Sequence, residues 1–270
     1  MIGSRWANGI ALLREPRLRS EPVFSDEELM RYSRQIMLPE LDIAGQEKLR
    51  QSSVLVAGLG GLGSPVSLYL AAAGVGTLIL VDHDQVDLSN LQRQIAHDTT
   101  RVGGKKVESA AAAIQRINPH CNVITHAEEI TPSNGQALVE KADLIVDCSD
   151  NFSLRFLLNR LSVKNKITLV SGAAIRMDGQ ISVYDPKQSK SPCYNCLFDE
   201  AGEDDRRCAT NGVLAPIVGV VGSIQATEAI KSLTGVGTTL VGRLLIFDGL
   251  NMQFREIKIK PNPACPTCGT

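Results

Sequence analysis

The 270-residue sequence lacks several features that would assign it to particular protein classes. No apolar run is long enough to span a membrane. The formal net charge is −1, from 28 basic and 29 acidic residues, so no excess charge favours nucleic acid or an anionic membrane as a partner. Near the N-terminus only residues 9–13 are apolar, which is too short for the core of a secretion signal. We therefore expect a cytoplasmic protein with no nucleic-acid or membrane partner.

The chain also lacks internal repeats, and its composition suggests a single domain with one extension. Residues 1–24 carry four arginines and are expected to form a flexible N-terminal extension rather than a targeting segment. Residues 25–270 are expected to form the domain. Seven cysteines without a secretion signal indicate a reducing compartment, which favours metal binding or thiol chemistry over disulfides.

Hydrophobic patterning predicts an α/β fold, with a Rossmann-like and mainly parallel sheet covered by helices on both faces. Ser25 and Glu28 have the spacing of a capping box, so a helix should begin near Asp26 and end before Pro39. Strands are then expected at residues 54–58, 78–82, 123–126, 144–147 and 168–171, alternating with helices. Three shorter, antiparallel strands are expected at residues 180–184, 244–248 and 253–259, and the last long helix is expected at residues 217–233. A long polar loop is expected at residues 186–212.

A glycine-rich turn follows the first strand and matches the dinucleotide fingerprint: Gly58, Gly60, Gly61 and Gly63. Glycines there let backbone N–H groups approach a phosphate at a helix N-terminus. Asp82 ends the next strand and can accept hydrogen bonds from ribose hydroxyls. These residues alone would suit NAD, FAD or another nucleotide.

The segment from Ser89 to Gln94 favours a particular kind of nucleotide chemistry. It is expected to place Asn90, Gln92 and Arg93 beside the glycine turn. A hydride-transfer site has no evident need for such a cluster, whereas a site that neutralises a leaving pyrophosphate does.

Further polar residues are expected at the carboxyl ends of strands, where open α/β sheets bind ligands. Lys105 and Lys106 open a helix, and Asp150 and Asn151 follow the strand at 144–147. Arginine and lysine suit phosphate oxygens, and a single carboxylate such as Asp150 suits Mg²⁺ bridging phosphates.

Two C-x-x-C pairs form a second constellation, made of Cys193, Cys196, Cys265 and Cys268. Four thiolates favour tetrahedral Zn²⁺ in a structural rather than a catalytic site. The ion would tie the C-terminal tail to the loop in the middle of the chain. A thioredoxin-type redox site is the weaker interpretation, because neither pair lies at a βα turn.

The remaining cysteines and the histidines give weaker signals. Cys208 lies in the polar loop beside Arg206 and Arg207, and it is either an incidental exposed cysteine or a thiol that receives an activated acyl group. Cys121 and Cys148 are expected in the core. The four histidines have no evident partner in the sequence.

Together these motifs resemble the MoeB/ThiF/HesA family of adenylating enzymes, bacterial relatives of the ubiquitin-activating enzymes. The resemblance runs from about Ser25 to the C-terminus. It rests on residues 31–36 (RYSRQI), 58–63 (GLGGLG), 89–94 (SNLQRQ), 147–151 (DCSDN), 171–176 (SGAAIR) and 215–219 (APIVG), together with both cysteine pairs.

The resemblance implies a reaction in which ATP with Mg²⁺ adenylates the C-terminal glycine of a ubiquitin-like sulfur-carrier protein and releases pyrophosphate. It implies that Asp150 holds Mg²⁺, that Arg34 reaches the phosphates of the partner subunit in a homodimer, and that Cys208 is a possible acyl acceptor. The nucleotide-binding set that it implies is Gly58, Gly60, Gly61, Gly63, Asp82, Asp84, Ser89, Asn90, Leu91, Gln92, Arg93, Lys106, Asp150 and Asn151.

The sulfur carrier is less clearly indicated than the reaction. Residues 171–180 look like the branch that serves the molybdopterin synthase small subunit, whereas the loop at 197–208 is closer to the thiamine branch. We favour the molybdopterin carrier (MoaD-like) and keep the thiamine carrier (ThiS-like) as the alternative. A sulfurtransferase or a cysteine desulfurase would supply sulfur. An NAD-dependent oxidoreductase and a non-catalytic nucleotide-binding protein are the alternatives from other classes.

Overall fold

The computed structural model describes residues 24–200 and 212–269. Its core is one eight-stranded sheet with the order β3-β2-β1-β4-β5-β6-β7-β8. The first five strands in the chain run parallel: β1 (Ser53–Ala57), β2 (Thr77–Val81), β3 (Asn122–His126), β4 (Leu144–Asp147) and β5 (Thr168–Ile175). The last three are antiparallel: β6 (Asp178–Tyr184), β7 (Arg243–Asp248) and β8 (Gln253–Lys258). The predicted fold class is confirmed.

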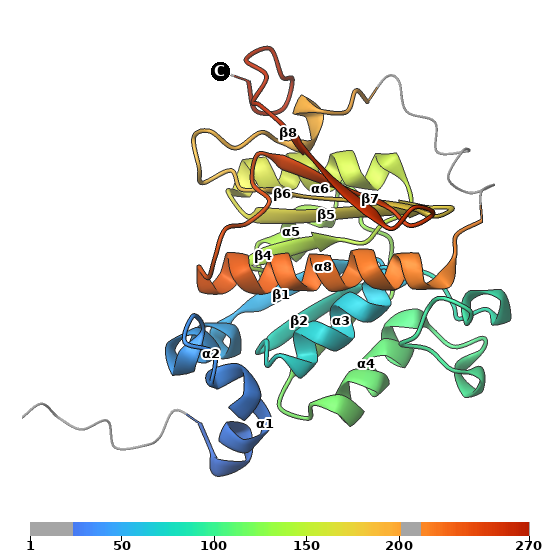
Figure 1. Cartoon of the computed structure of the whole chain (residues 1–270). Helices are drawn as coiled ribbons and strands as arrows, with labels where there is room; N and C mark the ends of the chain where they lie inside the picture. Colours follow the sequence, from blue (N-terminus) through green and yellow to red (C-terminus); the bar gives the residue numbers. More distant parts are fainter. Residues whose placement is uncertain (1–23, 201–211, 270) are drawn as a thin grey trace, which may run out of the picture.

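Helices cover both faces of this sheet (Figure 1). They are α1 (Asp26–Ile36), α2 (Asp42–Gln51), α3 (Gly63–Ala72), α4 (Lys106–Ile117), α5 (Gly135–Val139), α6 (Phe152–Asn165) and α8 (Ala215–Thr234). Short 3-10 turns are η1 (Leu88–Asn90), η2 (Thr99–Arg101) and η3 (Tyr194–Cys196). No helix in the described part of the chain is long and apolar enough to cross a membrane.

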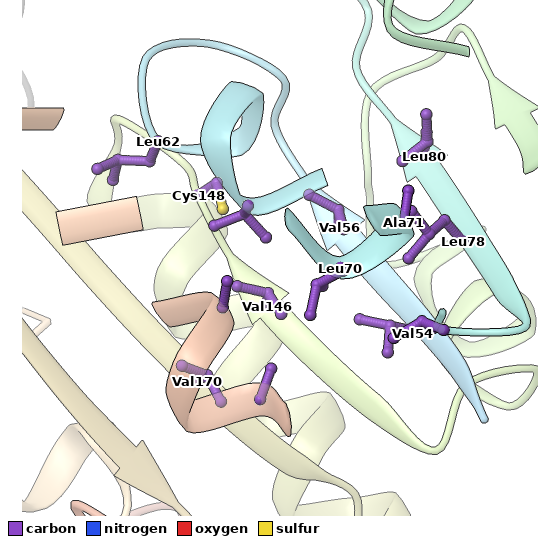
Figure 2. Packing of buried hydrophobic residues seen from close by; sticks show 14 of the residues in the cluster. Val54, Val56, Leu62, Leu70, Ala71, Leu78, Leu80, Val146, Cys148 and Val170 are labelled. Carbon is purple, nitrogen blue, oxygen red and sulfur yellow. The ribbon is translucent and has the colours of Figure 1, made fainter. Parts of the chain in front are cut away.

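Alternating side chains of the parallel strands build two separate cores. Val54 and Val56 of β1 join the core under α3, α4 and α8. Figure 2 shows these two residues with Leu70 of α3 and with side chains of neighbouring strands. Leu55 and Ala57 point the other way and pack with α5 and α6. Because both faces of the parallel strands are covered, these strands are almost continuously apolar in sequence.

Helix α1 lies at the amino-terminal edge of the parallel strands, next to the segments that lead into β2 and β3. Its Gln35 side chain donates to the backbone oxygen of Ala73, just before β2, at 2.9 Å. Asn118, just before β3, donates to the hydroxyl of Tyr32 at 2.8 Å. Ser25 and Glu28 form the expected capping box. Residues 1–23 of the predicted extension lie outside the described residues, but Phe24 is buried and packs on Tyr32, so the ordered domain begins at least one residue earlier than predicted.

Two elements differ from the sequence prediction. Helix α2 was not predicted; its N-cap Leu41 makes no side-chain cap hydrogen bond, so the usual start signal is missing. Strand β5 continues to Ile175 and β6 begins at Asp178, which makes a longer hairpin than expected. This hairpin extends beyond the parallel strands, so it contributes to a wall beside their carboxyl ends.

Candidate active site

A cavity of about 680 Å³ lies at the carboxyl ends of the parallel strands. It is lined by residues that follow β1, β2 and β4, and by the β5–β6 hairpin. The sheet order places β1 between β2 and β4, so the chain passes from one side of β1 to the other at this point. Open α/β sheets bind ligands where the strand order reverses in this way.

The glycine-rich turn between β1 and α3 forms one wall of the cavity, and its backbone conformation requires glycine at two positions. Gly58 has a φ of +91°, and a Cβ atom there would lie 2.8 Å from the Cys148 carbonyl oxygen. A Cβ atom on Gly63 would overlap the Gly58 carbonyl oxygen. The backbone N–H groups of Gly60 and Gly61 have no hydrogen-bond partner among the described residues. They are therefore available to an anionic ligand at the start of α3.

Asp82 and Asp84 follow β2 and form the adjacent wall. Asp82 accepts a hydrogen bond from the Leu59 N–H at 2.7 Å and another from the Asp84 N–H at 2.8 Å. Its carboxylate thus holds the glycine turn and retains lone pairs for a ligand hydroxyl.

Two cations line the cavity near these carboxylates. Lys106 begins α4 and is only 5% exposed, with its Nζ 2.7 Å from the Asp84 carboxylate. Burial alone would raise the pKa of Asp84, but the hydrogen bond and the charge of Lys106 lower it. Arg93 donates to the Ser89 backbone oxygen at 3.3 Å. An anionic ligand that reached Lys106 would compete with Asp84 for the ammonium group.

In the segment after β4, hydrogen bonds hold the backbone that precedes Asp150. The fully buried Asp147 accepts hydrogen bonds from the N–H and the hydroxyl of Ser149, at 3.0 and 2.6 Å. It also accepts one from the Ser171 hydroxyl on β5 at 2.8 Å. Arg155 of α6 donates to the Ser149 backbone oxygen at 2.9 Å. Asp150 itself is exposed and makes no hydrogen bond or ion pair with the described residues, so its carboxylate can bind a cation.

The structure brings most of the predicted site residues together around the cavity. Those that line it are Gly58, Gly60, Gly61, Asp82, Asp84, Arg93, Lys106, Asp150 and Asn151. Asn151 also caps α6 by accepting from the Leu154 N–H. Gly63 and the four residues Ser89, Asn90, Leu91 and Gln92 do not line it. Arg34 is exposed on α1, at the opposite edge of the sheet, and Cys208 lies outside the described residues.

Sequence reasoning missed several polar residues of the lining: His83, Gln94, Glu128, Glu129, Ser149, Arg155, Asp178 and Gln180. Glu128 and Glu129 follow β3, so the rule that located Asp150 at a strand end could also have found them. Among the described residues, the lining holds six acidic side chains and three basic ones apart from histidine, namely Asp82, Asp84, Glu128, Glu129, Asp150 and Asp178 with Arg93, Lys106 and Arg155. A polyphosphate would therefore need a metal cation to enter without strong repulsion.

The prediction that no histidine has an evident partner was wrong, because His83, His120 and His126 each lie beside a carboxylate. His97 is buried and has two partners. Its Nε2 lies 3.0 Å from the Leu59 backbone oxygen, and its Nδ1 lies 2.9 Å from the Ser109 hydroxyl on α4. A carbonyl oxygen can only accept, so Nε2 carries the proton and Nδ1 accepts from Ser109. Both partners of His97 are distant in sequence, so no local pattern could indicate them.

Burial lowers the pKa of His97, and Lys106 contributes in the same direction, against the raising effects of the Leu59 carbonyl, Asp82 and Asp98. The unfolded chain therefore binds a proton at this position at a higher pH than the folded protein does. We predict that the free energy of unfolding falls as the pH drops below about 6.5, the usual pKa of histidine. The free energy of unfolding in urea is measured at pH 7.5 and at pH 5.5, for the unmodified protein and for His97→Gln. The loss between the two pH values is expected to be smaller in the variant. An equal loss of stability in both would contradict the prediction.

The four predicted cysteines form a compact cluster. Cys193 Sγ lies 3.5 Å from Cys265 Sγ, and Cys196 Sγ lies 3.4 Å from Cys268 Sγ. All four sulfur atoms lie within 4.8 Å of one another, so the group could hold a metal ion. The Asn262 N–H points at Cys196 Sγ at 3.3 Å, the kind of backbone donor that supports a thiolate ligand. Cys121 and Cys148 are buried elsewhere, as predicted, and burial raises the pKa of both thiols.

Comparisons with known proteins agree with this geometry. The chain is 49% identical over 245 residues to molybdopterin-synthase adenylyltransferase of Escherichia coli K12, an alignment that covers 91% of this chain and 98% of the relative. The chain is also 46% identical to adenylyltransferase and sulfurtransferase MOCS3 of Drosophila grimshawi. That alignment covers 90% of this chain and 55% of the relative.

A solved structure shows the same fold. The crystal structure of E. coli MccB with MccA-N7isoASN superimposes with a TM-score of 0.80 over 90% of this chain and 75% of that chain, at 24% identity. The ThiF family model matches residues 32–267. The match covers the sheet, the cavity and three of the four clustered cysteines, and the chain belongs to the ThiF family.

Proposed function

We propose that this chain is an adenylyltransferase that uses ATP to activate the C-terminal glycine of a ubiquitin-like sulfur-carrier protein, most closely the small subunit of molybdopterin synthase. The observation that carries the proposal is the cavity, which combines a glycine turn with unpaired N–H groups, Arg93, Lys106 and Asp150. A relative that matches over nearly its whole length is named a molybdopterin-synthase adenylyltransferase, and this supports the same assignment.

The reaction joins two anions and needs little proton transfer. The carrier's carboxylate attacks the α-phosphorus of ATP, the bond to the β-phosphate oxygen breaks, and pyrophosphate leaves with the bonding electrons. Because the nucleophile is already ionised, no general base is needed. The protein must align the reactants and neutralise charge on the leaving group. The cations at one end of the cavity are suited to that task.

Each proposed role follows from a position in the cavity. The N–H groups of Gly60 and Gly61 would donate to the nucleotide, and Asp82 would accept from the ribose. Arg93 and Lys106 would bind phosphate oxygens, with Lys106 exchanging Asp84 for the phosphate. Asp150 and Asn151 would lie beside the metal and the phosphates. When bound, Mg²⁺ would reduce the negative charge that develops on pyrophosphate. Asn90 would reach the phosphates only if η1 moved, because it does not line the cavity now.

We also propose that the enzyme is a homodimer with shared sites. Arg34 lies at the amino-terminal edge of the sheet, whereas the cavity lies at the carboxyl-terminal edge. It cannot reach the cavity of its own chain from there. An arginine that serves the reaction would therefore enter the cavity of a second subunit.

A molybdopterin-type carrier is the favoured substrate, and a thiamine-type carrier is the alternative. A sulfurtransferase or a cysteine desulfurase would then convert the acyl-adenylate to the thiocarboxylate. The assignment can be tested with purified protein, ATP, Mg²⁺ and each candidate carrier. We expect carrier-dependent exchange of labelled pyrophosphate into ATP, and a carrier mass increased by one AMP group. An absence of exchange with both carriers would overturn the adenylation assignment and leave a non-catalytic nucleotide-binding protein or an oxidoreductase.

We propose that the cysteine cluster holds structural zinc. Zn–S bonds of about 2.3 Å in a tetrahedron place neighbouring sulfur atoms about 3.8 Å apart, close to the distances within the cluster. The two cysteine pairs join η3 to the C-terminal segment, which Figure 1 shows meeting beside the sheet. The ion would therefore stabilise the fold and leave the cavity chemistry unchanged.

Purified, reduced protein is accordingly expected to contain about one zinc ion per chain. Cys196→Ser should remove most of this zinc and lower the midpoint of thermal unfolding, because metal binding contributes to folding. Metal analysis with calorimetry provides the measurement. Cys121→Ser is the matched control, since Cys121 is a buried cysteine outside the cluster, and it should keep the zinc. A metal-free native protein would refute the zinc site.

A further inference from the structure

The turn residue Leu59 is held from two sides by side chains of different segments. Its N–H donates to Asp82 at 2.7 Å. Its carbonyl oxygen accepts from His97 at 3.0 Å and, at the longer distance of 3.4 Å, from the Ser64 hydroxyl. These contacts fix two successive peptide planes, that between Gly58 and Leu59 and that between Leu59 and Gly60. Because Gly58 precedes Leu59 and Gly60 and Gly61 follow it, the backbone of the turn would otherwise have a wide choice of conformations.

The second of these planes contains the N–H of Gly60. In a trans peptide the carbonyl and the following N–H point in opposite directions. No cis peptide occurs in the described residues, so the contact of Leu59 with His97 directs the Gly60 N–H away from His97. Gly60 lines the cavity, and its N–H has no hydrogen-bond partner among the described residues.

His97 also ties the turn to the helix that carries Lys106. Its other ring nitrogen accepts from Ser109, three residues after Lys106 on α4. Lys106 pairs with Asp84, and the Asp84 N–H donates to Asp82, which holds Leu59 again. These contacts form a closed loop around one end of the cavity, although His97 does not line the cavity itself. A residue outside the cavity thus sets the geometry of groups inside it.

We propose that His97 is a positioning residue for nucleotide binding, which aims the Gly60 N–H at an oxygen of the bound nucleotide by holding the Leu59 carbonyl. The inference rests on the proposed function insofar as a nucleotide occupies this cavity. A correctly aimed backbone donor contributes to binding of the ground state and the transition state alike. Its loss therefore raises the KM for ATP and leaves kcat nearly unchanged.

Two substitutions separate the two contacts of the ring. A glutamine amide can reach the position of Nε2 and donate to Leu59, whereas an asparagine amide reaches only the position of Nδ1 and can still bind Ser109. His97→Asn is expected to raise the dissociation constant of ATP·Mg²⁺ about tenfold, the effect of one hydrogen bond. His97→Gln should bind nearly as well as the unmodified protein. His120→Asn makes the same change at an exposed histidine outside the cavity lining and the glycine turn, so it is the matched control and should stay within about twofold.

Titration calorimetry with a non-hydrolysable ATP analogue and Mg²⁺, without any carrier, is the primary measurement, and ATP-dependent kinetics give the split between KM and kcat. Weaker binding by His97→Asn, near-normal binding by His97→Gln and unchanged binding by His120→Asn would support the proposal. Equal affinity of the His97→Asn and His97→Gln variants, or equal weakening by His120→Asn, would overturn it while leaving the adenylation assignment intact. An unmodified protein that binds no ATP would overturn both. Failure of adenylation with normal ATP binding would overturn the proposed function alone.

Discussion

The Asp150→Ala variant is expected to lose carrier adenylation by a factor of about 10³ or more while its fold stays intact. Asp150 is an exposed carboxylate at the end of β4, and it faces the same cavity as Arg93 and Lys106. Hydrogen bonds among Asp147, Ser149 and Ser171 hold the segment that precedes Asp150, so its carboxylate can bind a cation without rearrangement of that segment. Removal of this ligand leaves the charge on the leaving pyrophosphate without its main compensation.

Pyrophosphate exchange at saturating ATP, repeated over a range of Mg²⁺ concentrations, gives the measurement. Glu108→Ala is the matched control, because Glu108 is an exposed carboxylate on α4 that does not line the cavity, and it should change the rate by less than about twofold. Thermal unfolding of both variants checks the fold. Near-normal exchange by a folded Asp150→Ala would remove Asp150 from the proposed metal site.

Features of the fold and the site that depend on neighbouring residues in the sequence were predictable. The parallel strands, the glycine turn and Asp150 each depend on a few adjacent residues, and the structure has them where the sequence placed them. The cysteine cluster was also predictable, although Cys193 meets Cys265 across 72 positions, because four thiols in two close pairs have one common chemical use.

Features that depend on tertiary contacts were not predictable. Helix α2 has no side-chain hydrogen bond at its N-cap, and it packs against α1 and α8. His97 finds its partners 38 and 12 residues away. Asn90, Gln92 and Arg93 were expected beside the glycine turn, but of these only Arg93 lines the cavity, where Gln94 joins it. In each case a local pattern gave no information on which neighbour the chain would meet.

Arg34→Ala is expected to cut adenylation by a factor of about 10² to 10³, as loss of one preorganised charged donor does in other enzymes. The residue is exposed on α1 and lies at the edge of the sheet away from its own cavity. A large effect would thus be difficult to explain within one chain. Arg116→Ala is the matched control, since Arg116 is also an exposed arginine near that edge, in the last turn of α4, and its activity should stay within about twofold.

Mixing Arg34→Ala with Asp150→Ala tests whether the sites are shared. If Arg34 serves the partner subunit, each mixed dimer has one site with both defects and one site with neither. Equal mixing makes half of the dimers mixed, so about one quarter of the normal activity should return after subunit exchange. If Arg34 acts within its own chain, every site in a mixed dimer carries one defect and activity stays low. Subunit exchange is confirmed independently by mass spectrometry of tagged chains, and exchange without recovered activity would refute the shared site.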